Sequence, residues 1–256
     1  IPISRAEWDM AREPEKAAEL IEQHQPAIVI NPAAYTNVDG AEEDQATAFT
    51  VNATTVGELA KACKQASIPL LHISTDYVFD GTKETPYNED DPINPINVYG
   101  KSKAEGERLA REVLNAHIIL RTSWVFSAAG KNFVTTMRRL GKERDELKIV
   151  DDQRGGPTSA DCIAKVLMCI SNQYLHGKAI SWGTYHYAGS PIVSWYEFAE
   201  AIFEAEDEDR RPKLIPCTSA EYLTKAVRPK NSALSTLQIK GEMGVLGCDW
   251  VTELRS

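Results

Sequence analysis

The first half of the chain alternates short apolar runs with longer segments in which apolar residues recur at helical spacing. The apolar runs, which predict buried strands, are 27–31, 68–74 and 117–123. The segments with helical spacing, which predict helices, are 12–24, 42–66, 98–114 and 132–143. Strands separated by helices of this length indicate βαβ units and a parallel sheet.

The second half of the chain has a less regular pattern. It predicts strands at 147–152 and 184–189 and helices at 160–172 and 194–206. The last of these helices opens with Ser194, and Glu197 follows three residues later, which is typical of a capping box. We therefore divide the chain near residue 145 into a first part, 1–145, and a second part, 146–256.

The composition and charge exclude several classes of protein. The chain has 256 residues, of which 43% are hydrophobic and 25% charged, as in an ordinary globular protein with a substantial core. Its longest apolar runs are far too short to span a bilayer, and no secretory signal is visible, so we expect no membrane association. The net charge of −9 would repel a phosphate backbone, so nucleic acid is not an expected partner. The net charge does not exclude a local basic pocket for a small phosphorylated ligand.

Cysteine and histidine usage point to a reducing compartment without a metal site. The 5 cysteines are odd in number, scattered, and include no CxxC pair, which favours the cytoplasm. The 5 histidines show no ligand spacing, so we expect no zinc site. A magnesium requirement is left open by the sequence.

The stretch NVYGKSK, residues 97–103, places Tyr99 and Lys103 four positions apart in a predicted helix. Residues with this spacing share a helix face, so a phenol and an ammonium would lie side by side. The same spacing recurs at Tyr174 and Lys178, where no other chemical groups surround the pair. The spacing alone therefore does not distinguish a proton-transfer pair from two surface residues, and the neighbouring segments must decide.

Polar and small residues gather where the predicted strands of the first half end. They are Asn31, Ala33, Ala34, Thr75, Asp76, Tyr77, Thr122, Ser123 and Trp124. Ligands of open parallel sheets bind outside the carboxyl ends of the strands, so these groups are expected to converge on one cleft. The helix with Tyr99 and Lys103 falls between the second and third strands.

Several longer motifs make a resemblance specific. In chain order they are NPAAYTNVDGAE (31–42), VNATTVGELAKAC (51–63), HISTDYVFDGT (72–82), NVYGKSKAEGE (97–107), LRTSWVF (120–126), NFVTTMRRL (132–140), DDQRGGPT (151–158) and RPKNSAL (228–234). With these motifs the chain resembles the dTDP-4-dehydrorhamnose reductases, a branch of the extended short-chain dehydrogenase/reductase family. The resemblance covers nearly the whole sequence.

The resemblance implies both a fold and a reaction. It implies a Rossmann-like, doubly wound parallel sheet that binds NAD(P) in 1–145, and a smaller α/β part that binds the substrate in 146–256. The implied reaction is reduction of the C4 keto group of dTDP-4-dehydro-6-deoxy-L-mannose to dTDP-L-rhamnose. The implied cofactor is NADPH, with NADH as the alternative. The implied partner is the dTDP-sugar, and a homodimer is left open.

The family pattern assigns catalytic roles to three residues. Tyr99 is the implied general acid, since a free phenol titrates near pH 10 and holds its proton at neutral pH. The ammonium of Lys103 is expected to lower the pKa of this phenol, and the resemblance also has it hold the cofactor ribose. The resemblance assigns the third position to Thr75 rather than to its neighbour Ser74. Strand alternation points these two side chains to opposite faces, so they cannot both serve.

The same pattern assigns binding roles. On the cofactor side it implies Asp9, Met10, Asn31, Ala33, Ala34, Asn52, Tyr99 and Lys103. On the substrate side it implies Thr75, Asp76, Tyr77, Trp124, Gln153 and Arg228. Several of these have ordinary structural alternatives: Thr75 as a strand-end cap of the backbone, Asn52 as a cap at a helix start, Trp124 as core, and Arg228 as half of a surface ion pair.

The chain also departs from the family pattern. The family begins with a strand and a Gly-rich turn that holds the cofactor pyrophosphate, and neither G-x-G-x-x-G nor G-x-x-G-x-x-G occurs in the first part of this chain, 1–145. We expect that this strand and turn are absent from the sequence. Two alternatives to a reductase follow. One is a non-catalytic subunit, like the regulatory subunit of methionine adenosyltransferase. The other is a nucleotide-sugar epimerase or dehydratase, which the single acid of Asp76-Tyr77 disfavours.

Overall fold

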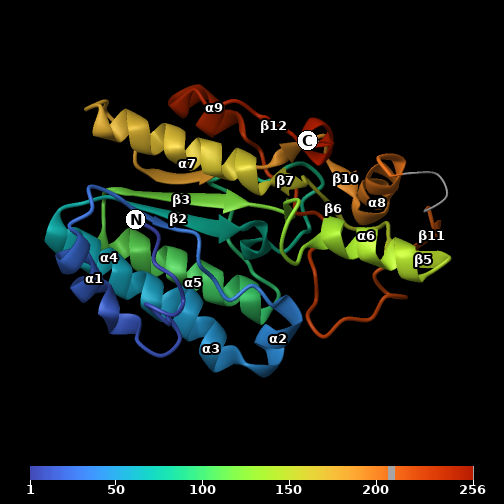
Figure 1. Ribbon diagram of the computed structural model, residues 1–256, viewed down its shortest axis with the longest axis horizontal. Helices are drawn as coiled ribbons and strands as arrows, with labels where there is room; N and C mark the ends of the chain where they lie inside the picture. Colours follow the sequence, from blue (N-terminus) through green and yellow to red (C-terminus); the bar gives the residue numbers. More distant parts are fainter. Residues whose placement is uncertain (207–210, 256) are drawn as a thin grey trace.

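A four-stranded parallel sheet forms the centre of the protein. The computed structural model describes residues 1–206 and 211–255. The strand order is β1 (Val29–Asn31), β2 (Leu70–Thr75), β3 (His117–Thr122) and β8 (Gly183–His186), with every neighbouring pair parallel (Figure 1). The parallel sheet predicted from the alternating pattern is confirmed. Within the described residues no helix is long and apolar enough to cross a membrane.

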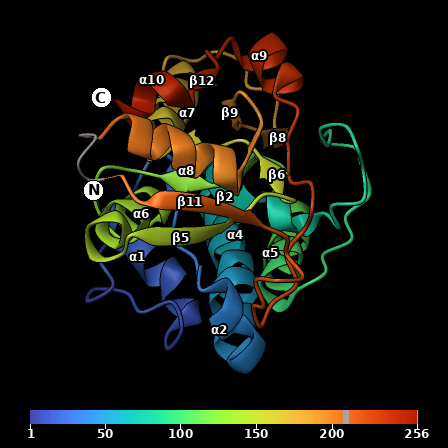
Figure 2. The same cartoon turned by 90° about the vertical axis from the view of Figure 1, so that its right-hand side faces the viewer.

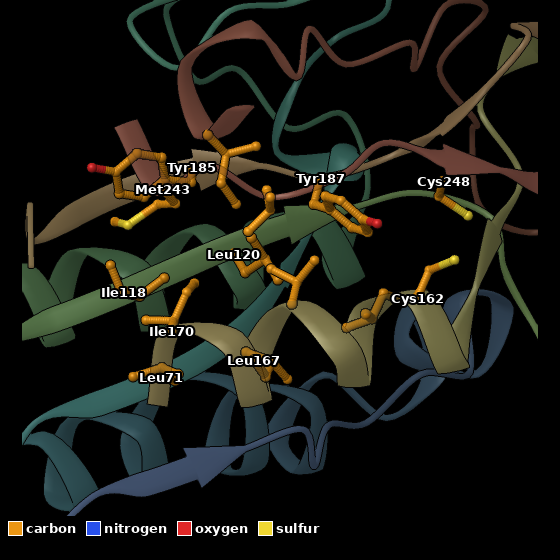
Figure 3. Packing of buried hydrophobic residues seen from close by; sticks show 14 residues of the cluster. Leu71, Ile118, Leu120, Cys162, Leu167, Ile170, Tyr185, Tyr187, Met243 and Cys248 are labelled. Carbon is orange, nitrogen blue, oxygen red and sulfur yellow. The ribbon is translucent and has the colours of Figure 1, made fainter. Parts of the chain in front are cut away.

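Helices cover both faces of this sheet (Figure 1). On one face lie α1 (Ala17–His24), which follows the short helix η1 (Pro14–Lys16), α4 (Thr55–Ala66) and α5 (Val98–Val113). On the other face lie α7 (Ala160–Leu175) and α9 (Leu237–Met243). Strand alternation divides the apolar residues between the layers: Ile119 packs with α4, while Ile118 and Leu120 pack with α7 (Figure 3).

The segment 42–66, predicted as one helix, is divided in the structure. Its elements are α2 (Val38–Glu43), α3 (Gln45–Phe49), the π-helical turn η2 (Thr50–Thr54) and α4. Asp44 ends α2 with non-helical angles, and its side chain accepts a hydrogen bond from the Thr47 amide, which begins α3. Apolar spacing could not detect this cap, because the capping group is a polar side chain.

A second lobe lies beyond the carboxyl ends of the strands (Figure 2). It contains α6 (Phe133–Glu143), α8 (Trp195–Glu204), α10 (Trp250–Leu254) and the parallel pair β5 (Glu146–Val150) and β11 (Lys213–Cys217). Short strand pairs connect the lobes: β4 (Val125–Phe126) with β7 (Thr158–Ser159), β6 (Arg154–Gly155) with β10 (Val193–Ser194), and β9 (Gly189–Ser190) with β12 (Cys248–Asp249). The capping box predicted at Ser194 and Glu197 is present at the start of α8.

The two parts of the sequence are interleaved in space. Although α7 and β8 follow residue 145, they contribute a covering helix and the fourth strand of the central sheet. The boundary near residue 145 therefore remains a proposal about which segments bind substrate.

One close backbone contact positions α5. A Cβ atom at Gly106 would lie 2.0 Å from the carbonyl oxygen of Asn52 in η2, so only glycine allows this approach. The contact matters for the site because α5 carries Tyr99 and Lys103.

Gly106→Ala is expected to lower the free energy of unfolding by about 1–3 kcal/mol, because the added methyl group forces α5 away from η2. Urea unfolding followed by circular dichroism measures the change. Gly241→Ala in α9 is the matched control, since nothing lies within 4 Å of its added Cβ. That substitution should stabilise the protein by about 0.5–1 kcal/mol. Equal changes in both variants would contradict the assigned contact.

Candidate active site

A cleft of about 630 Å³ opens at the carboxyl ends of β2 and β3, between the central sheet and the second lobe. Of the residues predicted from the sequence, it is lined by Ala34, Thr75, Asp76, Tyr77, Tyr99, Lys103 and Trp124. The structure thus brings the three predicted catalytic side chains to one cavity. They come from two elements, the end of β2 and the first turns of α5.

Thr75 lies at the centre of the polar contacts in the cleft. Its side chain lies close enough to the Tyr99 phenol to affect the pKa of that group. Its hydroxyl donates to Asp76 Oδ1 at 2.9 Å and accepts from the Tyr77 amide at 3.2 Å. The ring of Tyr77 meets that of Tyr99 edge-on, with centroids 5.8 Å apart. These contacts fix the orientation of the Tyr99 phenol.

Lys103 is buried beside the sheet, with 1% of its surface exposed. Its ammonium nitrogen donates to the carbonyl of Ile73 at 2.7 Å and lies 3.1 Å from Nε2 of His72. The other ring nitrogen of His72 lies 3.2 Å from the side-chain nitrogen of Asn31 at the end of β1. A continuous polar chain therefore runs from β1 through β2 to α5.

A buried ion pair holds α5 against the sheet one turn beyond Lys103. The guanidinium of Arg121 in β3 donates to both carboxylate oxygens of Glu107, at 2.9 and 2.8 Å. Ser74 donates to the same carboxylate at 2.5 Å, so its side chain points away from Thr75, as strand alternation predicted. Although burial opposes ionisation, Arg121 keeps the pKa of Glu107 below its ordinary value.

Burial dominates the protonation of the site. It raises the pKa of Tyr99 to about 12, against the smaller effect of the Thr75 side chain. The prediction that Lys103 lowers this pKa is therefore wrong: the phenol has lost its water, which outweighs any nearby positive charge. Burial also lowers the pKa of Lys103 to about 8, and it raises that of Asp76 to about 7. Tyr99 consequently holds its proton throughout the neutral range.

Two tryptophans form one wall of the cleft. Trp124 stacks on Trp195 of α8 with centroids 3.5 Å apart and planes 8° from parallel. Trp124 has a φ of 47°, a left-handed conformation that bulky residues rarely adopt. Its indole nitrogen donates to Ser232 at 3.1 Å. The strained backbone of Trp124 and its anchored ring therefore lie at the wall of the cavity, while its binding role stays a prediction.

A second hollow, of about 1120 Å³, lies beside β1. It is lined by the predicted cofactor residues Asp9, Met10, Asn31, Ala33 and Ala34. The two hollows share the lining residues Ile30, Pro32 and Ala34, so they meet at the carboxyl end of β1. A lining that continues from Met10 to Lys103 fits an extended dinucleotide.

Three predicted site residues do not line either hollow. Asn52 bonds to the Tyr35 backbone through both amide atoms and to the Ser102 hydroxyl, as expected for a residue that organises the local backbone. Gln153 donates to Ser219 at 2.9 Å. Arg228 pairs with Asp39 of α2 at 2.9 Å, the ion-pair alternative named above, but it also contacts the cleft residue Tyr77. Their binding roles stay predictions.

Sequence reasoning missed His72 and Trp195. A polar ring within the apolar run of β2, at the position that faces α5, was an available signal for His72. Trp195 had no local signal, because only the docking of α8 brings it to Trp124. In the described ranges no group of three or more His, Cys, Asp or Glu side chains could hold a metal ion.

The sheet, its covering helices and a Thr–Tyr–Lys set at the strand ends define an extended short-chain dehydrogenase/reductase. The fold matches UDP-glucose 4-epimerase from Brucella ovis, solved with NAD, with a TM-score of 0.78 at 17% identity over 95% of this chain and 80% of that one. The chain belongs to the RmlD substrate binding domain family, whose model matches residues 1–256.

Several relatives of the chain share one name. The chain is 46% identical to dTDP-4-dehydrorhamnose reductase from Aggregatibacter actinomycetemcomitans, over 93% of this chain and 82% of the relative. It is 43% identical to the Burkholderia thailandensis enzyme of that name, over 98% and 87%. A dTDP-4-dehydrorhamnose reductase structure from Clostridium acetobutylicum has a TM-score of 0.92 at 36% identity, covering 100% and 88%. A dTDP-4-dehydrorhamnose reductase structure from Bacillus anthracis, in complex with NADP, has a TM-score of 0.90 at 34% identity. The match covers 99% of this chain and 87% of that one.

Asp76→Asn tests how burial controls protonation in the cleft. The pKa of Asp76 rises from 3.8 to about 7 on folding, so between these values the folded state holds a proton that the unfolded state has lost. The wild-type free energy of unfolding should therefore fall, relative to that of Asp76→Asn, as the pH rises from about 4 to about 7.

The measurement is urea unfolding of both proteins at several pH values. A relative loss of more than about 1 kcal/mol across this range is expected for a shift of this size. A difference that stays constant with pH would mean that Asp76 titrates normally.

Proposed function

We propose that this chain reduces the C4 keto group of dTDP-4-dehydrorhamnose to give dTDP-L-rhamnose, with NADPH as the cofactor. The observation that carries the proposal is the meeting of Thr75, Tyr99 and Lys103 in one cleft of a chain whose relatives are named dTDP-4-dehydrorhamnose reductase. The solved relative with NADP supports the cofactor. These relatives favour a reductase over a non-catalytic regulatory subunit.

The residues of the cleft suit proton delivery to a carbonyl oxygen. NADPH, when bound, supplies the hydride that C4 accepts. Tyr99, with a pKa of about 12, is protonated at working pH and can give its proton to the C4 oxygen, which leaves a phenolate. Thr75 holds the phenol in place and can donate to the same oxygen. Lys103 is the positive charge available to stabilise the phenolate.

We assign the remaining predicted residues to the two sides of this centre. On the cofactor side we place Asp9, Met10, Asn31, Ala33 and Ala34, supported by their common hollow, with Asn52 as the residue that fixes the local backbone. On the substrate side we place Asp76, Tyr77, Trp124, Gln153 and Arg228. A cytoplasmic location, supported by five free cysteines, and a homodimer remain proposals.

Tyr99→Phe should lower turnover by roughly 10²–10⁴, the usual contribution of a general acid, with little loss of stability. The measurement is NADPH oxidation in the presence of dTDP-4-dehydrorhamnose. Tyr174→Phe is the matched control, since Tyr174 lies in α7, four residues before Lys178, and packs on Trp182 away from the cleft. Wild-type turnover in Tyr99→Phe would refute its assignment as the proton donor.

Arg228→Ala should raise the substrate KM by roughly tenfold to a hundredfold, since a charge-assisted contact to the diphosphate contributes about 1.5–3 kcal/mol. The affinity for NADPH should barely change. Arg108→Ala serves as the control, because Arg108 also forms ion pairs but lies on the exposed face of α5. If Arg228→Ala weakened the binding of substrate and NADPH equally, or of neither, the role of Arg228 would be structural, through its ion pair with Asp39.

A further inference from the structure

In the polar chain Asn31–His72–Lys103, each hydrogen bond has a defined donor and acceptor. The Asn31 side-chain oxygen accepts from the Ala33 amide at 3.1 Å, which fixes the orientation of the side-chain amide. Its nitrogen therefore faces Nδ1 of His72 at 3.2 Å and donates to it. Because Nδ1 accepts, a neutral imidazole must carry its proton on Nε2.

His72 is neutral in this setting. Its ring has no exposed surface, and burial together with the charge of Lys103 lowers its pKa well below the ordinary value. The Nε2–H group then points at Lys103 Nζ, 3.1 Å away. An amine at Nζ can accept this hydrogen bond while it donates to the Ile73 carbonyl, whereas an ammonium has only donors.

The opposite arrangement, in which Lys103 donates to Nε2 of His72, leaves hydrogen-bond donors without acceptors. With an ammonium at Lys103 as its donor, His72 would need its proton on Nδ1, facing the NH₂ group of Asn31. Turning the amide around would place that NH₂ against the Ala33 amide instead. Each alternative leaves two donors in contact in a buried site, which is costly.

We propose that Asn31 and His72 are positioning residues for Lys103, which present Nε2–H to its side chain and favour the neutral amine. This inference rests on the proposed reductase function. Its consequence is that the charge of Lys103, which stabilises the Tyr99 phenolate, depends on the hydrogen bond between Lys103 and His72.

The other charges around Lys103 act on the same equilibrium. From α5, Glu107 favours the ammonium, although Arg121 of β3 and Arg111 neutralise that carboxylate. Tyr99 lies one turn earlier on α5, beside Asp76 of η3 (Asp76–Val78). Burial outweighs Glu107 and lowers the pKa of Lys103 to about 8, close to working pH.

The tautomer of His72 can be observed directly. In the NMR spectrum of ¹⁵N-histidine-labelled wild-type protein, we expect His72 to show the Nε2–H tautomer. Its signal is identified as the one that disappears in His72→Phe. In Asn31→Asp, both carboxylate oxygens accept, one from the Ala33 amide and one from Nδ1–H. The proton of His72 should therefore move to Nδ1, and Nε2 should accept from the ammonium of Lys103.

The same variants should change the pH dependence of kcat. In the wild type, kcat should fall on the alkaline side of its pH profile near pH 8. In Asn31→Asp this fall should shift to higher pH by at least about one unit, since the ammonium gains an acceptor. The double variant Asn31→Asp/His72→Phe keeps the new carboxylate without the imidazole, so its kcat should fall at the same pH as that of His72→Phe. A shift that persists in the double variant would mean that charge alone acts, which overturns the role of His72.

The NMR spectrum is recorded without turnover. The inferred role of His72 and the proposed reductase function can therefore be refuted independently of each other. A wild-type His72 with its proton on Nδ1 would overturn this inference whatever the activity. A folded chain that does not reduce dTDP-4-dehydrorhamnose would overturn the proposed function whatever the tautomer.

Discussion

The bidentate ion pair between Glu107 and Arg121 is the contact on which the arrangement of the site depends. Both groups are at most 2% exposed, and the pair joins the middle of α5 to β3 beneath the cleft. Because Tyr99, Lys103 and Glu107 are spaced four residues apart, fixing Glu107 against the sheet also directs Lys103 and Tyr99 toward the strand ends. Loss of one partner would leave a buried charge unpaired, which is strongly destabilising.

Two glycines allow α5 to pack closely against its other neighbours. Gly106 lets α5 meet η2, and Gly100 lets its first turn meet the carbonyl of Tyr77, 2.1 Å from where a Cβ would lie. Through η2, Asn52 connects α5 to the loop that follows β1. The cofactor side and the catalytic side of the cleft are therefore held by one set of contacts.

Tight packing of α5 also determines the protonation of the site. Removing water raises the pKa of Tyr99 and of Asp76 and lowers that of Lys103, so each group is shifted toward its neutral form. For a proton donor this is favourable, because the phenol holds its proton until negative charge develops on the substrate oxygen. The polar chain through His72 then provides hydrogen bonds for a lysine that is not permanently charged.

The sequence by itself determined the strands of the central sheet, β5, most helices and the Thr75, Tyr99 and Lys103 set, because apolar spacing, capping and motifs are properties of neighbouring residues. It did not determine the division of 42–66, where the polar side chain of Asp44 caps the start of α3. Only the tertiary structure placed β8 in the central sheet, Trp195 on Trp124, and His72 against a lysine 31 positions away. It also reversed the expected pKa shift of Tyr99, because burial and contacts between distant segments depend on how the layers pack, which no local pattern records.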